Sequence, residues 1–277
     1  MQNLFSYTGK RVLIAGCYSG MGEATARIVS ELGAAVVAVD VKKPSFACER
    51  FLEVDLRDER AIEQMVAEVA RSGPLDRVFY CAGLPGTKSA LDVMGVNFIG
   101  LRHTIEQCVP HIPRGGAAAS ISSSAGMAYL MNMQRVMGLL AAETPAAARA
   151  WVEQNQREPW FEPYSFSKMC TIVWTFRRGA SLTPATGVRL NCISPGPTDT
   201  PMMPAFIEQI GAEFMANFPK PIGRNSTAEE QGWALAFLNS DAASYVSGEN
   251  LYTDGGAGNG MMTGAITPPV PPPMPKR

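Results

Sequence analysis

The sequence predicts an α/β fold in which a parallel sheet of about seven strands carries helices on both faces. Short apolar runs alternate with amphipathic helical segments from the N-terminus to residue 252. The apolar runs are continuous, as is typical of strands that are buried on both faces of a sheet. The chain has 277 residues, of which 46% are hydrophobic, and this length suits one large α/β unit better than two.

The predicted strands are short, and most are separated from the next by a helical segment. We place them at residues 11–15, 34–39, 77–81, 117–121, 188–193 and 248–252, with a weak third strand at Val54. The predicted helices have apolar residues spaced three and four apart, the pattern of a helix with one buried face. They span residues 21–32, 57–71, 91–111, 163–181 and 228–239.

Two segments interrupt the alternation. Residues 126–160 separate a strand from its helix by more than a loop needs, and we expect two short helices there, the second beginning at Thr144-Pro145. Residues 200–224 are rich in Pro, Met and Phe. We therefore expect one unit over residues 1–266 that includes a helical insertion (126–160) and a lid (200–224). Residues 267–277 hold six prolines in eleven positions and should form an extended arm.

Composition argues against several classes of partner. The formal net charge of −1 gives no electrostatic basis for binding nucleic acid or an anionic membrane surface. No apolar stretch is long enough to span a bilayer, and residues 1–10 do not have the pattern of a secretory signal. Six scattered cysteines and two histidines favour reduced core thiols over disulfides or a metal site. These features predict a cytoplasmic protein that binds no metal.

Glycines at the first strand-to-helix junction indicate a dinucleotide site. They allow a tight turn and let the backbone approach a pyrophosphate at the helix N-terminus. The motif alone is weak evidence, but its position directly after the first strand strengthens it. We expect the cofactor to contact Gly16, Ser19, Gly20, Met21 and Gly22.

Asp40 ends the second predicted strand, 18 residues beyond Gly22. A carboxylate there accepts hydrogen bonds from the adenine ribose and repels a 2′-phosphate, which favours NAD over NADP. The alternative is an aspartate that only stabilises a turn. Lys42 and Lys43 complicate the choice of cofactor, unless they are simply solvated.

Tyr164 and Lys168 stand four residues apart on a predicted helix and so share one face. A nearby ammonium favours the phenolate, so we expect Lys168 to lower the pKa of Tyr164 and make it a useful acid or base. Ser123 ends a buried strand and can hold a substrate oxygen beside this pair. Ser122 and Ser124 compete for that role, although strand alternation would turn both away from it.

These motifs, in this order, resemble the short-chain dehydrogenase/reductase family from about Gly9 to Gly256. Two positions depart from the family pattern, with Ala15 in place of threonine and Cys81 in place of asparagine. The resemblance implies a Rossmann-type fold and an NAD cofactor. It also implies further cofactor contacts at Asp55, Leu56, Cys81, Ala82, Gly83, Tyr164, Lys168, Pro195, Gly196, Thr198 and Thr200.

The resemblance also implies an activity, the interconversion of a secondary alcohol and its ketone. Tyr164 would exchange the proton, Lys168 would hold the nicotinamide ribose, Ser123 would bind the substrate oxygen, and Asn97 would hold a relay water. Alternatively, Asn97 only bridges backbone. The insertion is similar to that of the 3α-hydroxysteroid dehydrogenase/carbonyl reductase branch. Alternatives are an aryl-alcohol or dihydrodiol dehydrogenase of the same family and a non-catalytic NAD-sensing protein.

Apolar side chains predict a small hydrophobic substrate. The candidate contacts are Met202, Met203 and Phe206 in the lid and Met127, Trp160 and Phe161 on the opposite wall. Ordinary packing is the alternative explanation for the lid residues. We also expect a homodimer, because the insertion should cover the outer face of helix 163–181. A tetramer remains possible if the insertion forms a new contact.

Overall fold

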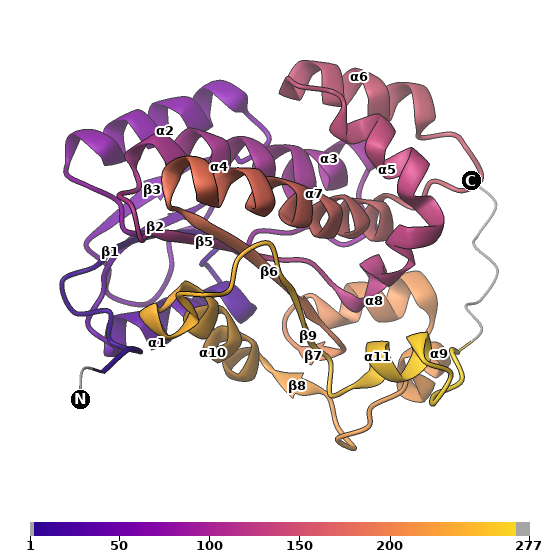
Figure 1. Ribbon diagram of the computed structural model, residues 1–277. Helices are drawn as coiled ribbons and strands as arrows, with labels where there is room; N and C mark the ends of the chain where they lie inside the picture. Colours follow the sequence, from indigo (N-terminus) through magenta and orange to yellow (C-terminus); the bar gives the residue numbers. More distant parts are fainter. Residues whose placement is uncertain (1–2, 270–277) are drawn as a thin grey trace.

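The computed structural model describes residues 3–269, which contain one seven-stranded sheet between two layers of helices (Figure 1). The strand order is β3-β2-β1-β4-β5-β6-β9, and every neighbouring pair is parallel. The predicted fold class is therefore confirmed. The strands are β1 (Arg11–Ala15), β2 (Ala35–Asp40), β3 (Arg50–Glu53), β4 (Arg77–Tyr80), β5 (Ala117–Ile121), β6 (Arg189–Pro195) and β9 (Asn250–Thr253).

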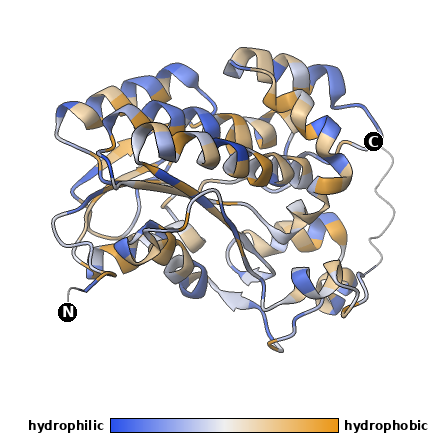
Figure 2. Cartoon of the chain, in the orientation of Figure 1, coloured by the Kyte–Doolittle hydropathy of each residue, from blue (hydrophilic) through white to orange (hydrophobic). Residues whose placement is uncertain are grey.

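Helices cover both faces of the sheet. Figure 1 shows one layer above the sheet, comprising α2 (Glu59–Arg71), α3 (Ala90–Met94), α4 (Leu101–Cys108) and α7 (Pro163–Thr186). The layer below comprises α1 (Gly20–Glu31) and α10 (Ala228–Asn239). Hydrophilic and hydrophobic residues alternate along these helices, as expected of amphipathic elements (Figure 2).

The strands are continuously apolar because their residues alternate between two cores. Leu13 of β1 belongs to the core beneath α2, α4 and α7, whereas Val12 and Ile14 belong to the core that includes residues of α1 and α10. All three side chains have no exposed surface.

Two predicted boundaries were wrong. The third strand lies at Arg50–Glu53 and ends just before Val54. It forms the edge of the sheet with only two apolar, half-buried residues, so its hydrophobic signal is weak. Helix α7 continues past the predicted end at residue 181 to Thr186, and Gly187 then ends it in the left-handed conformation with φ +75°.

The insertion forms three helical pieces, η3 (Ser124–Asn132), α5 (Met133–Leu140) and α6 (Pro145–Asn155). Thr144 caps α6 as expected, accepting a hydrogen bond from the Ala147 N–H at 3.2 Å. The Trp151 ring of α6 stacks on Phe166 of α7, with centroids 5.5 Å apart. The insertion therefore buries an apolar part of the α7 surface.

The remaining elements are short or lie in the segment after β6. The segment 200–224 contains α8 (Met203–Ile210) and α9 (Ala212–Asn217). Shorter elements are η1 (Gly95–Gly100), η2 (Val109–His111), β7 (Thr198–Asp199), β8 (Ser226–Thr227), η4 (Asp241–Ala243) and α11 (Ala257–Met262). Within residues 3–269, no helix combines the length and apolar character needed to cross a membrane. Most of the predicted proline-rich arm lies outside the described residues.

Candidate active site

Two loops meet where β1 and β4 lie side by side, the point at which the strand order reverses. Gly16 has φ +83°, and a Cβ there would lie 2.7 Å from the Ala82 side chain. A Cβ at Gly22 would overlap the Gly16 carbonyl oxygen. Only glycine permits this close backbone packing at the start of α1. The resulting cradle at a helix N-terminus fits the pyrophosphate of a dinucleotide.

Asp40 lies at the end of β2, directly beside this loop. Its Oδ2 accepts a hydrogen bond from the Tyr18 N–H at 3.0 Å, and its Oδ1 accepts one from the Lys42 N–H at 3.2 Å. Asp40 thus stabilises the local turn, the simpler of its two predicted roles. A carboxylate has about four acceptor positions, so these bonds leave capacity for ribose hydroxyls as well.

The structure brings Ser123, Tyr164 and Lys168 together. Ser123 is the second residue after β5 and caps η3, its hydroxyl accepting a hydrogen bond from the Ala125 N–H at 3.1 Å. Tyr164 and Lys168 lie in the first turns of α7, with Lys168 Nζ 5.5 Å from the centre of the Tyr164 ring. The ammonium donates to the Ile121 carbonyl at the end of β5, at 2.8 Å.

Burial controls the ionisation of this pair. It raises the pKa of Tyr164 to about 12, an effect opposed by a hydrogen bond with Ser123 and reinforced by the charge of Glu162. Burial also lowers the pKa of Lys168 to about 8. The prediction that Lys168 lowers the tyrosine pKa is therefore wrong for this arrangement, in which the ammonium is directed at Ile121. Tyr164 is protonated at neutral pH, the state that donates a proton to a ketone oxygen.

The other two serines have different surroundings. The Ser122 hydroxyl donates to the Lys168 carbonyl at 2.9 Å, so it braces α7 against the end of β5. Ser124 is buried as the first residue of η3. Ser123 is the member of the run whose hydroxyl lowers the pKa of Tyr164, in opposition to burial.

Asn97 lies on the π-helix η1, an irregularity often found at functional sites. Its Oδ1 accepts a hydrogen bond from the Leu84 N–H at 2.7 Å, and its Nδ2 donates to the Leu84 carbonyl at 3.0 Å. Nδ2 also lies 3.3 Å from the Ser167 hydroxyl of α7. Asn97 thus bridges backbone, as the simpler alternative predicted, and ties the Cys81-Ala82-Gly83 turn to the helix that carries Tyr164.

Comparison with known proteins agrees with this geometry. Residues 10–135 match the family model described as short chain dehydrogenase, and residues 150–258 match the model described as Enoyl-(Acyl carrier protein) reductase. The chain is 34% identical over 251 residues to the 3-alpha-hydroxysteroid dehydrogenase/carbonyl reductase of Comamonas testosteroni, an alignment covering 88% of this chain and 95% of that relative. The chain belongs to the short-chain dehydrogenase family.

Two further comparisons support the assignment of the chain to this family. The chain is 30% identical over 249 residues to the Coniferyl-alcohol dehydrogenase of Pseudomonas sp., an alignment covering 90% of this chain and 96% of that relative. The crystal structure of the 3-alpha-hydroxysteroid dehydrogenase from Pseudomonas sp. B-0831, complexed with NADH, superimposes with a TM-score of 0.79 at 27% identity. That match covers 93% of this chain and 100% of the other. The protein is therefore an oxidoreductase of the kind that uses a nicotinamide cofactor.

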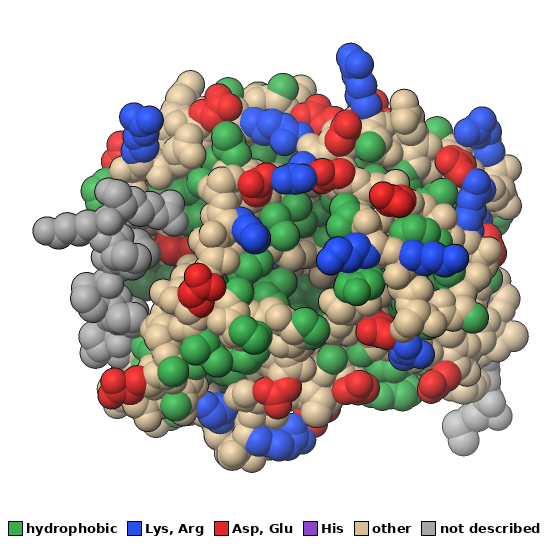
Figure 3. All heavy atoms as spheres, turned by 180° about the vertical axis from the view of Figure 1, so that it is seen from behind, with side chains coloured by type: hydrophobic (Ala, Val, Ile, Leu, Met, Phe, Trp, Pro, Cys, Tyr) green, Lys and Arg blue, Asp and Glu red, His purple; other side chains and the backbone are tan. Residues whose placement is uncertain are grey.

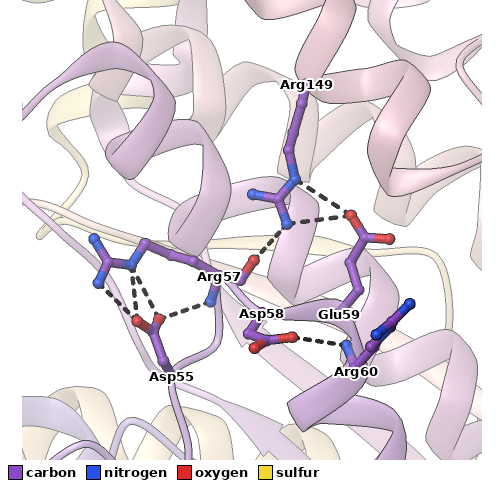
Figure 4. Close-up of a pocket in the computed structure, with 6 residues that line it drawn as sticks. All are labelled: Asp55, Arg57, Asp58, Glu59, Arg60 and Arg149. Atoms are coloured by element: carbon purple, nitrogen blue, oxygen red, sulfur yellow. Dashed lines mark hydrogen bonds and ion pairs between the residues drawn. The ribbon is translucent and has the colours of Figure 1, made fainter.

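Asp55 is partly exposed and forms an ion pair with an arginine side chain. Its carboxylate pairs with the Arg57 guanidinium at 2.7 Å, and this hydrogen bonding lowers the pKa of Asp55. Asp55 and Arg57 line a pocket that is shown in Figure 4. Across this pocket, Arg149 of the insertion donates to Glu59 and to the Arg57 carbonyl. Leu56 is buried beside this network. A contact between Asp55 and the cofactor remains a prediction for the dehydrogenase.

The loop after β6 packs against the segment after β9 and against the glycine-rich loop. A Cβ at Gly196 would lie 3.0 Å from the Asp254 side chain, so the Pro195-Gly196 turn packs directly on the segment after β9. The Thr198 hydroxyl donates to the Gly196 carbonyl at 3.0 Å. Thr200 reaches the glycine-rich loop, where its side chain would lie 3.5 Å from a Cβ at Gly20.

The predicted substrate residues separate into two groups. The Phe206 ring packs edge-on against Tyr164, with centroids 5.0 Å apart, and Met202 and Met203 lie at the start of the same helix. Met127 is half-buried on η3.

Trp160 and Phe161 require a correction. Their rings pack with Trp151 and Phe166, and Phe161 is only 3% exposed. They therefore join the insertion to α7 rather than forming a wall beside Tyr164. Aromatic composition alone did not distinguish a core cluster from a substrate wall.

Two residues at the site were missed. Glu162 caps α7, its carboxylate accepting from the Tyr164 N–H at 3.1 Å and the Ser165 N–H at 2.6 Å. An acidic residue just before Pro163 is a recognisable helix-start signal. Gln209 of α8 donates to Glu162 Oε1 at 3.1 Å. No local signal identifies Gln209, because its partner is 47 positions away in the chain.

Proposed function

We propose that this dehydrogenase interconverts a hydrophobic secondary alcohol, hydroxysteroid-like or aromatic, and its ketone with NAD(H). The observation that carries the proposal is the cluster of Ser123, Tyr164 and Lys168 beneath the Phe206 ring. This cluster lies beside a glycine cradle of the kind that binds a pyrophosphate.

The proposed chemistry couples two transfers. The bound nicotinamide would supply the hydride donor or acceptor. Tyr164 would give its proton to the carbonyl oxygen in reduction and take it back in oxidation. Ser123 would orient that oxygen, and Lys168 would hold the nicotinamide ribose. Buried surroundings strengthen these electrostatic effects.

The apolar lid supports a hydrophobic substrate. The aromatic ring of Phe206 in α8 packs over Tyr164. The flexible thioether side chains of Met202 and Met203 lie at the start of the same helix as Phe206. The face opposite to the view of Figure 1 has a hollow around which hydrophobic side chains gather, with charges of both signs interspersed (Figure 3). The names of the relatives, a 3-alpha-hydroxysteroid dehydrogenase/carbonyl reductase and a coniferyl-alcohol dehydrogenase, support a hydrophobic substrate, and the first of them supports a secondary alcohol.

Turnover tests the proposal. Purified protein with NAD should oxidise hydrophobic secondary alcohols, including hydroxysteroids and aryl carbinols, with a higher kcat/KM than small polyols. A preference for polyols would overturn the substrate class. Tight NAD binding without turnover of any alcohol or ketone would favour the cofactor-sensing alternative.

We predict a preference for NAD over NADP, because the Asp40 carboxylate would repel a 2′-phosphate. Asp40→Asn keeps an oxygen that can accept from the Tyr18 N–H but removes the charge. It should therefore improve kcat/KM for NADP by about tenfold with little change in stability, an effect near 1.4 kcal/mol. Measured kcat/KM values that favour NADP in the unaltered protein would contradict the prediction and implicate Lys42 and Lys43.

We also propose a cytoplasmic homodimer. All six cysteines are free, as expected in a reducing compartment. The insertion packs on α7, so this part of the helix is not available to a second subunit. Light scattering at micromolar concentration should give the mass of two chains. A single tetrameric species would show that the insertion does not block the larger assembly.

A further inference from the structure

The Gln209 amide joins three parts of the site that are distant in sequence. Its Nε2 donates to Glu162 Oε1 at 3.1 Å, at the start of the helix that carries Tyr164. The amide also lies flat against Gly86, where a Cβ would come within 2.8 Å of its Cδ. Gly86 belongs to the loop after β4, so Gln209 bridges this loop, α8 and α7.

The orientation of the amide is fixed by its partner. A carboxylate accepts hydrogen bonds and cannot donate them, so the NH₂ group must face Glu162. Gln209 Oε1 is then buried and has no hydrogen-bond partner among the described residues. The bond to a charged acceptor compensates for this buried oxygen, since such bonds are stronger than neutral ones.

Other residues of the segment 200–224 contact the glycine-rich loop and Tyr164. Thr200 and Pro201 would lie 3.5 and 3.8 Å from a Cβ at Gly20. The Phe206 ring covers Tyr164 at 5.0 Å. Among the polar contacts of α8 side chains in residues 3–269, the bond from Gln209 to Glu162 is the one that ties this helix to α7.

We propose that Gln209 is a positioning residue that latches α8 over Tyr164 through Glu162 and thereby sets how tightly the closed site holds its substrate. This inference rests on the proposed function for its substrate, but the latch itself can be tested without turnover. Substrate entry and product release would each require the latch to open.

Gly86 and Gln209 provide a matched pair of substitutions. Gly86→Ala should displace the Gln209 amide, the flexible end of a side chain, because Gly86 does not have the positive φ that would strain alanine. Gln209→Ala removes the same bond directly. Each should raise KM for the alcohol by about tenfold, the size expected for losing a hydrogen bond to a charged group. Adding Gly86→Ala to Gln209→Ala should have almost no further effect.

Exchanging the two side chains gives a second test. Glu162→Gln alone places two amides together, and Gln209→Glu alone places two carboxylates together. The double variant Glu162→Gln with Gln209→Glu can rebuild one amide–carboxylate bond and should recover most of the lost affinity. The Glu162 charge raises the pKa of Tyr164. Glu162→Gln should therefore shift alcohol oxidation to lower pH, because oxidation uses the deprotonated tyrosine.

Hydrogen exchange separates the latch from the enzyme activity. Amides of residues 203–210 should exchange several-fold faster in Gln209→Ala and Gly86→Ala than in the unaltered protein, whether or not any alcohol is turned over. Exposed Glu208 lies next to Gln209 on α8, so Glu208→Ala is the control and should change neither exchange nor KM. Unchanged exchange in both latch variants, or additive KM effects of Gly86→Ala and Gln209→Ala, would overturn the proposal.

Discussion

Replacing Tyr164 with phenylalanine should lower kcat by about 10²- to 10⁴-fold in both directions, the usual contribution of a general acid or base. The phenylalanine ring can keep its contact with Phe206, so the lid and the fold should be preserved. Only the proton that moves to or from the substrate oxygen is lost. We expect the Kd for NAD to change by less than about threefold, under 1 kcal/mol.

The matched control is Tyr245→Phe, because Tyr245 is fully exposed and makes no contact with this site. Steady-state rates and NAD titrations of both variants, with thermal unfolding, separate chemistry from folding. A Tyr164→Phe protein that retains a large fraction of the normal kcat would show that Tyr164 is not the acid or base.

Gly22→Ala should produce the largest loss of cofactor affinity. Gly22 lies in the first turn of α1, and its added methyl would overlap the Gly16 carbonyl and meet Cys81 Cβ at 3.0 Å. These neighbours are a backbone group and a packed loop, so α1 must move away from the cradle. We expect the Kd for NAD to rise at least about tenfold and stability to fall by about 1–3 kcal/mol, as for other overpacked sites.

Gly95→Ala is the matched control for this substitution. It also adds a methyl to a helical glycine, but the nearest atom would be a flexible Arg57 side-chain carbon at 3.4 Å. Calorimetric titration with NAD should show little change in this variant. Equal NAD affinity in Gly22→Ala and the unaltered protein would mean that the cradle at α1 does not hold the cofactor.

The fold was largely predictable because its signals are local. Continuous apolar strands between amphipathic helices follow directly from burial of the sheet on both faces, as Val12, Leu13 and Ile14 show. The edge strand β3 was misplaced because it buries little and so carries little hydrophobic pattern. Helix α7 extends past its predicted end at residue 181, with Pro184 inside it and Leu182 buried in its last turn.

The candidate site was predictable where its geometry is local and not where it depends on packing. The four-residue spacing of Tyr164 and Lys168 and the close approach of Gly16 and Gly22 are properties of one segment each. The direction of the Tyr164 pKa shift depends on how deeply the tertiary structure buries the phenol. The bond between Gln209 and Glu162 depends on how α8 meets α7, which no sequence spacing specifies.

Transfer of deuterium from a substrate labelled at its carbinol carbon tests the central claim most directly. A hydrophobic secondary alcohol that carries deuterium at this carbon should give deuterated NADH and the matching ketone in equal amounts, as mass spectrometry can measure. Tyr164→Phe should bind NAD and give almost none of either product. The account would be contradicted if NAD is bound but no labelled alcohol of this class transfers deuterium to it.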